Sequence, residues 1–348
     1  MSQTTQCSSN RATKEIVLTV VLDEKKETRN LSDAFRAHKK LLFGIAYRML
    51  SSAEDAEDIV QDAFIKFGEI PPDRVQNEKA LLISIVTRRS IDRLRSASRQ
   101  KEEYIGPWLP EPLLASHDLD PSLVYEGEET LSTAFLLVLE RLSPPERAVF
   151  LLRDVFDFDY AEISRILERT PESCRKLNER ARQRVREERK TAPLPFEKKQ
   201  KLLEKFLLAC RGRSLEELAG LLRDDVIVYA DGGGRVSSAL NPIYGRFKSA
   251  RFFLGLLKKY QERGAVSKTK LVEVNGGPAL LFYLNGKLDT ITTMEFDRDR
   301  IVRIYSVRNP DKLAFIQKQI SGSSLRVWLQ DTRRKLSLMR RAYFSLVF

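Results

Sequence analysis

Hydrophobic spacing in the first part of the chain predicts helices. Ser51-Ser52-Ala53-Glu54 fits a capping box, and apolar residues then recur from Ala56 to Phe67 at the i, i+3, i+4, i+7 spacing of an amphipathic helix. Pro71-Pro72 interrupts this spacing, and a further apolar stripe from Glu78 to Ser98 predicts another helix. We therefore expect residues 31–103 to form an all-helical domain.

The next segment breaks the helical pattern. Residues 104–126 contain four prolines, which disfavour a helix and indicate an extended linker. Fully extended, its 23 residues can reach about 75 Å. The linker also carries Trp108, a large side chain that could anchor it to another part of the protein.

Helical spacing returns in residues 127–190. Ser143-Pro144-Pro145-Glu146 has the residues of a helix cap with proline at the first helical position, and Thr170-Pro171 has the same pattern. A short helix opening at Asp159 and a turn around Glu168–Thr170 complete a helix-turn-helix outline. On the helix that begins at Pro171, basic side chains fall opposite the apolar ones. An ordinary solvated helix would look similar, but the capped helix directly upstream favours DNA binding.

Residues 196–313 combine helical and strand-like patterns, unlike the all-helical segments before them. Two amphipathic helices, a strand and a third helix precede further strand-like runs, and Asn285-Gly286 is typical of a type I′ hairpin turn. The strand-like runs are Val226–Ala230, Val266–Val274, Ala279–Leu284, Leu288–Phe296 and Ile301–Val307. We expect an α+β cone in which helices pack on a curved antiparallel sheet around an interior pocket.

Composition narrows the class of protein. The chain has 348 residues and a formal net charge of +12, which is compatible with a nucleic-acid partner. Charge is segregated, at −5 over Ala53–Asp62 and +5 over Thr87–Lys101. No apolar run approaches the ~20 residues of a membrane span, and the N-terminal apolar run makes a poor signal peptide. Three scattered cysteines and two histidines predict no disulfide framework, metal site or cofactor, so we expect a cytoplasmic protein.

Several motifs together resemble a known family. The string AEDAEDIVQDAF at Ala53–Phe64 resembles region 2 of the sigma-70 superfamily of bacterial RNA polymerase sigma factors, and residues 143–187 resemble its region 4. The absence of anything but a linker between them resembles the extracytoplasmic-function (ECF) group. YIGPWLPEPL at Tyr104–Leu113, DGGGRV at Asp231–Val236 and RNPDKL at Arg308–Leu313 are similar to the ECF subgroup with a C-terminal SnoaL-like domain.

The resemblance implies two partners, core RNA polymerase (the β′ clamp helices and the β subunit) and promoter DNA. The residues implied to bind core polymerase are Asp55, Asp58, Gln61 and Asp62. Those implied to read the −10 element are Arg88, Arg89, Asp92, Arg93 and Arg95. Those implied to read the −35 element are Arg175, Lys176, Glu179, Arg182 and Arg186. Leu81 and Arg88 stand where many ECF factors carry Trp and Asn, so we expect strand opening to rely less on aromatic stacking.

We also expect the SnoaL-like domain to regulate the sigma regions within the same chain, because only a short proline-containing joint, Thr191–Pro195, separates it from the DNA-reading helix. The implied regulatory loops contain Asp231, Gly232, Gly233, Gly234, Asn309, Pro310, Asp311, Lys312 and Leu313. Carboxylates and tyrosines that could line its pocket and contact a small-molecule ligand are Tyr229, Asp231, Tyr244, Tyr283, Asp289 and Glu295. Fold analogy does not transfer activity, so we expect no enzyme.

Two alternatives remain open at this stage. One is a SnoaL-like enzyme fused to a DNA-binding module, and the other is a plain helix-turn-helix repressor. The acidic helix argues against a repressor, which has no use for a polymerase-binding face. Residues 1–30 and the basic tail 314–348 fall outside the resemblance. The tail has the spacing of a basic amphipathic helix that could contact membrane, DNA, polymerase or its own protein.

Overall fold

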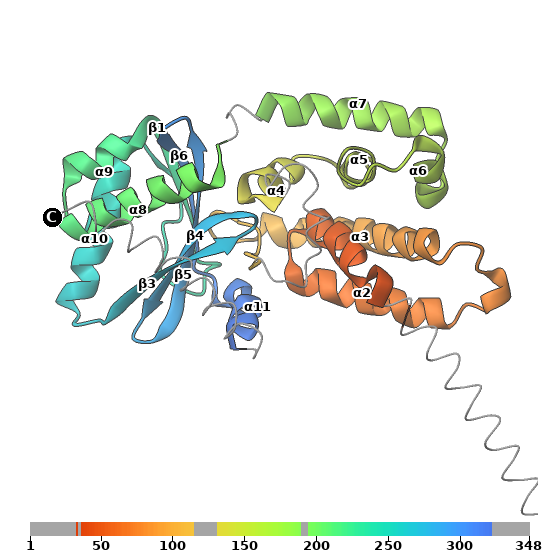
Figure 1. Ribbon diagram of the computed structural model, residues 1–348, viewed down its shortest axis with the longest axis horizontal. Helices are drawn as coiled ribbons and strands as arrows, with labels where there is room; N and C mark the ends of the chain where they lie inside the picture. Colours follow the sequence, from red (N-terminus) through yellow and green to blue (C-terminus); the bar gives the residue numbers. More distant parts are fainter. Residues whose placement is uncertain (1–32, 34–35, 115–130, 189–193, 322–348) are drawn as a thin grey trace, which may run out of the picture.

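The computed structural model describes residues 33, 36–114, 131–188 and 194–321. The predicted N-terminal extension, the linker after residue 114 and the tail after residue 321 lie outside these ranges. The helices before residue 190 form one half of the molecule, and a sheet with the helices of residues 196–321 forms the other, with residues 104–114 of the linker between them (Figure 1). No described helix is both long and apolar enough to cross a membrane.

The first helical domain contains a helix at residues 36–50, α2 (Ala53–Gly68), a 3₁₀ turn η1 (Pro72–Arg74) and α3 (Glu78–Glu102). The predicted apolar stripe of α2 is buried, as expected. The expected capping box is wrong in detail. Ser52 is the N-cap and accepts the Asp55 N–H, whereas Ser51 has a left-handed backbone with φ 58°. The glutamate that completes this cap comes from the linker and is described below.

The second helical domain contains α4 (Thr133–Leu139), α5 (Pro144–Phe150), the π-helical turn η4 (Leu151–Val155), α6 (Tyr160–Leu167) and α7 (Pro171–Glu188). Capping boxes begin α5 at Ser143 and α6 at Asp159. Glu168 ends α6 in a left-handed conformation, and Thr170 Oγ1 accepts the Ser173 N–H at 3.2 Å. The predicted helix-turn-helix is confirmed.

The two helical domains share one hydrophobic core. A single cluster of buried side chains runs from Leu42 in the first domain to Val185 in the second. Helix α3 contacts both α5 and α6, and the buried Arg147 of α5 donates a hydrogen bond to the Met49 carbonyl. The apolar stripes had indicated which faces are buried, but not that the two domains bury them against each other.

The C-terminal half contains α8 (Phe196–Gly212), α9 (Leu215–Leu221), α10 (Arg246–Glu262), α11 (Pro310–Ser321) and one six-stranded sheet. Its strands are β1 (Leu222–Asp231), β2 (Ile243–Tyr244), β3 (Ser267–Val274), β4 (Gly277–Leu284), β5 (Lys287–Asp297) and β6 (Arg300–Val307). Their order in the sheet is β2-β1-β6-β5-β4-β3.

The α+β prediction is confirmed, but the sheet is mixed rather than antiparallel. β3 to β6 form hairpins, and Asn285 and Gly286 have the positive φ angles, 50° and 80°, of the expected turn. β1 instead pairs in parallel with β6, a pairing that is possible because helix α10 and four strands separate the two in sequence. Turn motifs predict pairing only between strands that follow each other in sequence, and β1 and β6 do not.

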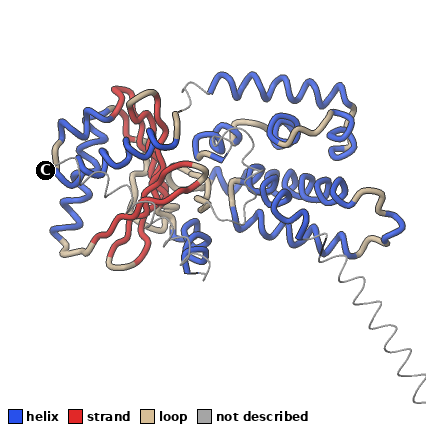
Figure 2. The backbone as a smooth tube through the Cα atoms, in the orientation of Figure 1, coloured by secondary structure: helices blue, strands red, loops and turns tan. Residues whose placement is uncertain are grey.

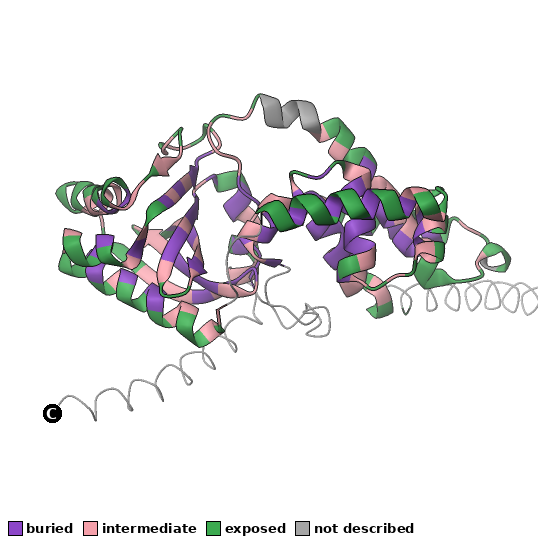
Figure 3. Ribbon diagram, turned by 90° about the horizontal axis from the view of Figure 1, so that it is seen from above, coloured by how far each residue is buried: buried purple, intermediate pink, exposed green. Residues whose placement is uncertain are grey.

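The two faces of the sheet have different coverings. Helices α8, α9 and α10 pack on one face, whereas the linker and α11 pack on the other (Figures 1 and 2). Buried residues occur along the strands as well as on the inner faces of the helices (purple in Figure 3). Helix α11 continues to Ser321 with Ile316 fully buried, so the folded domain extends beyond the predicted boundary at Leu313.

Candidate polymerase and DNA interfaces and the linker clamp

The acidic face of α2 points away from the core. Asp58, Gln61 and Asp62 are exposed, and Asp55 is half-buried. Two of these predicted polymerase-binding residues form ion pairs with predicted −10 residues of α3. Asp62 pairs with Arg89 at 3.2 Å, and Asp55 pairs with Arg93. The two candidate interfaces therefore adjoin each other across the α2–α3 pair.

Helix α3 carries the predicted −10 residues, but they do not share one environment. Asp92 and Arg95 pair with each other at 3.4 Å on the exposed side. Arg88 instead contacts the end of α6. Its Nε donates to the Ile166 carbonyl at 2.8 Å, and its Nη1 contacts Glu168 Oε1 at 2.6 Å. A cation suits this place because the C-terminal carbonyls of a helix carry partial negative charge.

The predicted −35 residues lie along the outer side of α7. Arg175, Lys176, Glu179, Arg182 and Arg186 are all exposed. Opposite them, Cys174, Leu177, Ala181 and Val185 are buried, as their spacing predicted. Arg182 forms an ion pair with Asp154 of η4, and the Arg175 guanidinium lies 5.4 Å from the centre of the Tyr160 ring.

The linker is held by an ion pair inside the C-terminal domain. Asp231 at the end of β1 is fully buried, and its Oδ2 lies 2.7 Å from Lys312 Nζ. The same carboxylate accepts the Leu109 N–H at 2.9 Å and the Tyr104 hydroxyl at 2.5 Å. Lys312 donates to the Leu109 carbonyl and lies 4.1 Å from the centre of the Trp108 ring. Burial, together with Asp231, raises the pKa of Tyr104, which keeps its hydroxyl a donor. We call these five residues the linker clamp.

Glycine and asparagine shape the loops around the clamp. Gly233 has φ 59°, and a Cβ there would lie 2.3 Å from Asn309 Nδ2, which itself donates to the Tyr104 hydroxyl at 3.0 Å. The Asp231 carbonyl accepts the N–H groups of Arg308 and Asn309, so the DGGGRV and RNPDKL loops are joined. The other residues predicted for these loops act locally. Gly232 and Gly234 approach Val236 and Ile105, Pro310 begins α11, Asp311 pairs with Arg235 and Leu313 is buried.

The linker also contacts the first helical domain. Glu111 accepts hydrogen bonds from the Ser52 hydroxyl at 2.9 Å and the Ala53 N–H at 2.7 Å, and so caps the acidic helix α2. Burial raises the pKa of Glu111, while these hydrogen bonds act in the opposite direction. The buried Tyr47 donates to the Glu111 carbonyl at 2.7 Å and to Asn275 Oδ1 at 3.3 Å. One stretch of linker thus touches both the sigma-like helices and the sheet.

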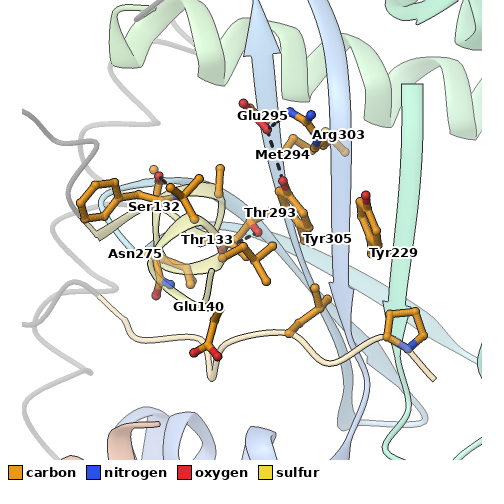
Figure 4. A pocket seen from close by; sticks show the side chains of 18 of the residues that line it. Ser132, Thr133, Glu140, Tyr229, Asn275, Thr293, Met294, Glu295, Arg303 and Tyr305 are labelled. Carbon is orange, nitrogen blue, oxygen red and sulfur yellow. Dashed lines mark hydrogen bonds and ion pairs between the residues drawn. The ribbon is translucent and has the colours of Figure 1, made fainter. Parts of the chain in front are cut away.

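A cavity of about 730 Å³ opens beside the clamp, between α4, the linker and the sheet (Figure 4). Of the six residues predicted for the pocket, only Tyr229 and Glu295 line it. Asp231 belongs to the clamp, Asp289 pairs with Arg308 at 2.8 Å, Tyr244 is exposed, and Tyr283 lies elsewhere on β4. Among the described residues, no cluster of His, Cys, Asp and Glu side chains could hold a metal ion.

Sequence reasoning missed several members of these sites. Lys312 appeared only within a motif, although a lysine 81 residues from Asp231 forms its ion pair. Arg303 and Tyr305 line the cavity, and alternation along β6 could have identified them. Asn275 precedes a glycine, as Asn285 does, which was a signal for a second turn at the cavity. Nothing local marks Glu111 as the cap of a helix 58 residues away.

Two protein-family models match the chain, and the matched residues coincide with the two helical domains. Residues 34–100 match Sigma-70 region 2, and residues 132–185 match Sigma-70, region 4. With an acidic outer helix in the first domain and a helix-turn-helix in the second, these matches define a sigma-70 class of transcription initiation factor.

Full-length relatives narrow this class. The chain is 31% identical over 288 residues to the ECF RNA polymerase sigma factor SigJ of Mycobacterium tuberculosis, covering 80% of this chain and 91% of that one. It is 26% identical to the probable ECF sigma factor SigI of the same species, covering 84% and 98%. The crystal structure of M. tuberculosis SigJ is similar with a TM-score of 0.65 and 28% identity, covering 81% and 98%.

The chain belongs to the ECF RNA polymerase sigma factors. It binds core RNA polymerase and promoter DNA and directs promoter-specific initiation, and it is not an enzyme. The enzyme and repressor alternatives are therefore not supported.

Proposed function

We propose that the C-terminal domain of this sigma factor regulates it in cis, by holding the two DNA-reading domains together in a closed arrangement that must open at a promoter. The observation that carries the proposal is the linker clamp. A buried ion pair of the C-terminal domain binds the backbone and side chains of the segment that joins the two sigma domains. We infer that the protein acts in the cytoplasm, where core polymerase is found.

In the closed arrangement the two DNA-reading helices lie too close together to contact both promoter elements. Helix α3 packs on α6, and α6 packs on α7. At about 10 Å per helix pair, the two predicted reading helices lie ~20 Å apart. Promoter elements one and a half duplex turns apart are separated by ~50 Å. The shared core and the Arg88 contact with α6 must therefore separate before both elements are read.

The surfaces proposed for partners are partly engaged within the chain. We propose that the acidic face of α2 docks on the β′ clamp helices of the polymerase, where opposite charge gives complementarity. In the closed arrangement, Asp62 and Asp55 are paired with α3 arginines. We assign the −10 element to α3 and the −35 element to α7, as the sequence predicted. Opening would free Arg88 for the −10 element.

The test is transcription from one cognate promoter by full-length protein carrying Asp231→Asn. The amide removes the charge that pairs with Lys312, so we expect a weaker clamp and a severalfold increase in transcript at equal protein and polymerase. Asp225→Asn is the matched control, because Asp225 lies on the same strand but is exposed and pairs with Arg223. Equal transcription by Asp231→Asn and the unchanged protein would refute cis regulation through the clamp.

A further inference from the structure

The cavity beside the clamp has walls from three parts of the chain. Helix α4 of the second sigma domain contributes Thr133 and Phe135, the linker contributes Trp108, and the sheet contributes Thr293 and Tyr305 (Figure 4). A hydrogen bond of 3.0 Å between the Thr133 and Thr293 hydroxyls joins α4 to β5 at its wall. Its volume of about 730 Å³ is within the range of ~300–1,000 Å³ typical of small-molecule sites.

The lining combines an apolar wall with a polar end and balanced charge. Aromatic and aliphatic side chains form much of the wall, and the Tyr229 and Tyr305 rings stack with their centres 5.6 Å apart. At the polar end Glu295 Oε2 accepts from Arg303 Nη1 at 2.9 Å and from the Tyr305 hydroxyl at 3.2 Å. The charged residues of the described lining are three cations and three anions: Arg141, Lys199, Arg303, Glu140, Glu188 and Glu295. Such a site favours an uncharged molecule. An ion would lose its hydration on entering, and a lining with no net charge would not compensate for that loss.

Asn275 supplies a hydrogen-bond donor that the described part of the protein does not satisfy. The residue lines the cavity and is only 3% exposed. Its Oδ1 accepts the Leu113 N–H at 2.7 Å, which fixes the orientation of the amide because a backbone N–H can only donate. Its Nδ2 has no hydrogen-bond partner among the described residues. A buried donor left unpaired is costly, and an acceptor oxygen on a bound molecule would satisfy it once a small shift of the side chain turns Nδ2 toward the cavity.

We propose that this three-walled cavity binds an uncharged, ring-containing small molecule with a carbonyl or hydroxyl oxygen, and that the bound molecule stabilises the closed arrangement. A molecule that contacts α4, the linker and the sheet together binds less well once these walls separate. Because the coupling between two equilibria is reciprocal, any partner that separates the walls must weaken binding of the small molecule. Binding itself does not depend on the proposed cis regulation, whereas the effect on the closed arrangement rests on it.

The first experiment titrates full-length protein with prodan, an uncharged naphthalene ketone whose fluorescence shifts to the blue when it leaves water. We expect saturable binding at one site per chain. Asn275→Asp replaces the donor by an acceptor, and we expect at least a tenfold loss of affinity. Asn285→Asp is the matched control. Asn285 has φ 50° against 52° for Asn275, also precedes a glycine and also accepts a backbone N–H, but does not line the cavity.

A second variant tests the wall formed by the sigma domain. Ala134→Phe on α4 places a ring at the cavity lining, and we expect it to abolish prodan binding. Ala80→Phe on α3 is its control, because Ala80 is exposed and does not line the cavity. Circular dichroism and the unfolding temperature of each variant show whether it is folded. Because the two variants alter different walls, the test still holds if one of them fails to fold.

The third measurement adds core polymerase at saturating concentration. We expect it to weaken prodan binding severalfold, because polymerase binding separates the walls. No saturable prodan binding, or unchanged binding by both folded cavity variants, would overturn the site. Unchanged affinity in the presence of polymerase would overturn the shared-wall mechanism. Neither result depends on Asp231→Asn transcription, so failure of this proposal is distinguishable from failure of cis regulation.

Discussion

Replacing Lys312 by Met should release the linker from the C-terminal domain. The Lys312 side chain is 8% exposed, and its ammonium group faces the fully buried Asp231 carboxylate at 2.7 Å. Methionine keeps an unbranched side chain of comparable length, so packing against Trp108 is largely retained. The change leaves Asp231 buried without its cation, although it still accepts hydrogen bonds from Tyr104 and Leu109.

The magnitude follows from burial. Removing one partner of a buried ion pair costs about 3–5 kcal/mol, and the two remaining hydrogen bonds place this case near the lower end. The lost interaction with the Trp108 ring adds about 0.5–2 kcal/mol. At about 1.4 kcal/mol per factor of ten, a total near 4 kcal/mol predicts roughly a 1,000-fold easier opening of the linker.

Amide hydrogen exchange measures this opening directly. The Leu109 N–H bonds to Asp231, so exchange in a peptide covering residues 105–114 should accelerate by about the predicted factor. Peptides from α7 should change far less. Lys205→Met on the exposed side of α8 is the control and should leave the linker unchanged. If linker exchange in folded Lys312→Met protein equals that of the unchanged protein, the clamp does not hold the linker.

Three further predictions concern the other surfaces. Asp58→Arg with Asp62→Arg should weaken pull-down of core polymerase while the unfolding temperature stays near its original value; undiminished pull-down would contradict the assignment of α2. Alanine at Arg175 and Lys176 should reduce the slope of log affinity for promoter DNA against log salt by about 1.8, at roughly 0.9 per phosphate contact, and an unaltered slope with unaltered sequence preference would mean that α7 is wrongly oriented. Gly233→Ala should lower the unfolding temperature more than Gly264→Ala, because both glycines have positive φ, 59° and 63°, but only at Gly233 would the new Cβ meet other atoms within 4 Å. Equal decreases in unfolding temperature for the two variants would show that the close approach of Asn309 to Gly233 does not affect stability.

Much of the secondary structure was determined by local sequence. The apolar stripe of α2, the capped starts of α5 and α7 and the Asn285-Gly286 turn were all predicted, because helix periodicity, caps and turns depend on residues within a few positions of one another. The order of the motifs also indicated the family. The outward position of Arg175 and Lys176 followed from periodicity alone.

Only the tertiary structure decided what the predicted faces contact. Periodicity shows that a face is buried but not which surface buries it, so the shared core of the two sigma domains was not foreseen. Arg88 was assigned to DNA, yet in the closed arrangement it binds the end of α6. The glutamate of the α2 capping box was expected at Glu54, whereas Glu111 of the linker supplies it beside the N-cap Ser52. In the linker clamp, Tyr104, Asp231 and Lys312 come from three segments, and only the folded chain brings their charges and hydrogen bonds within contact distance.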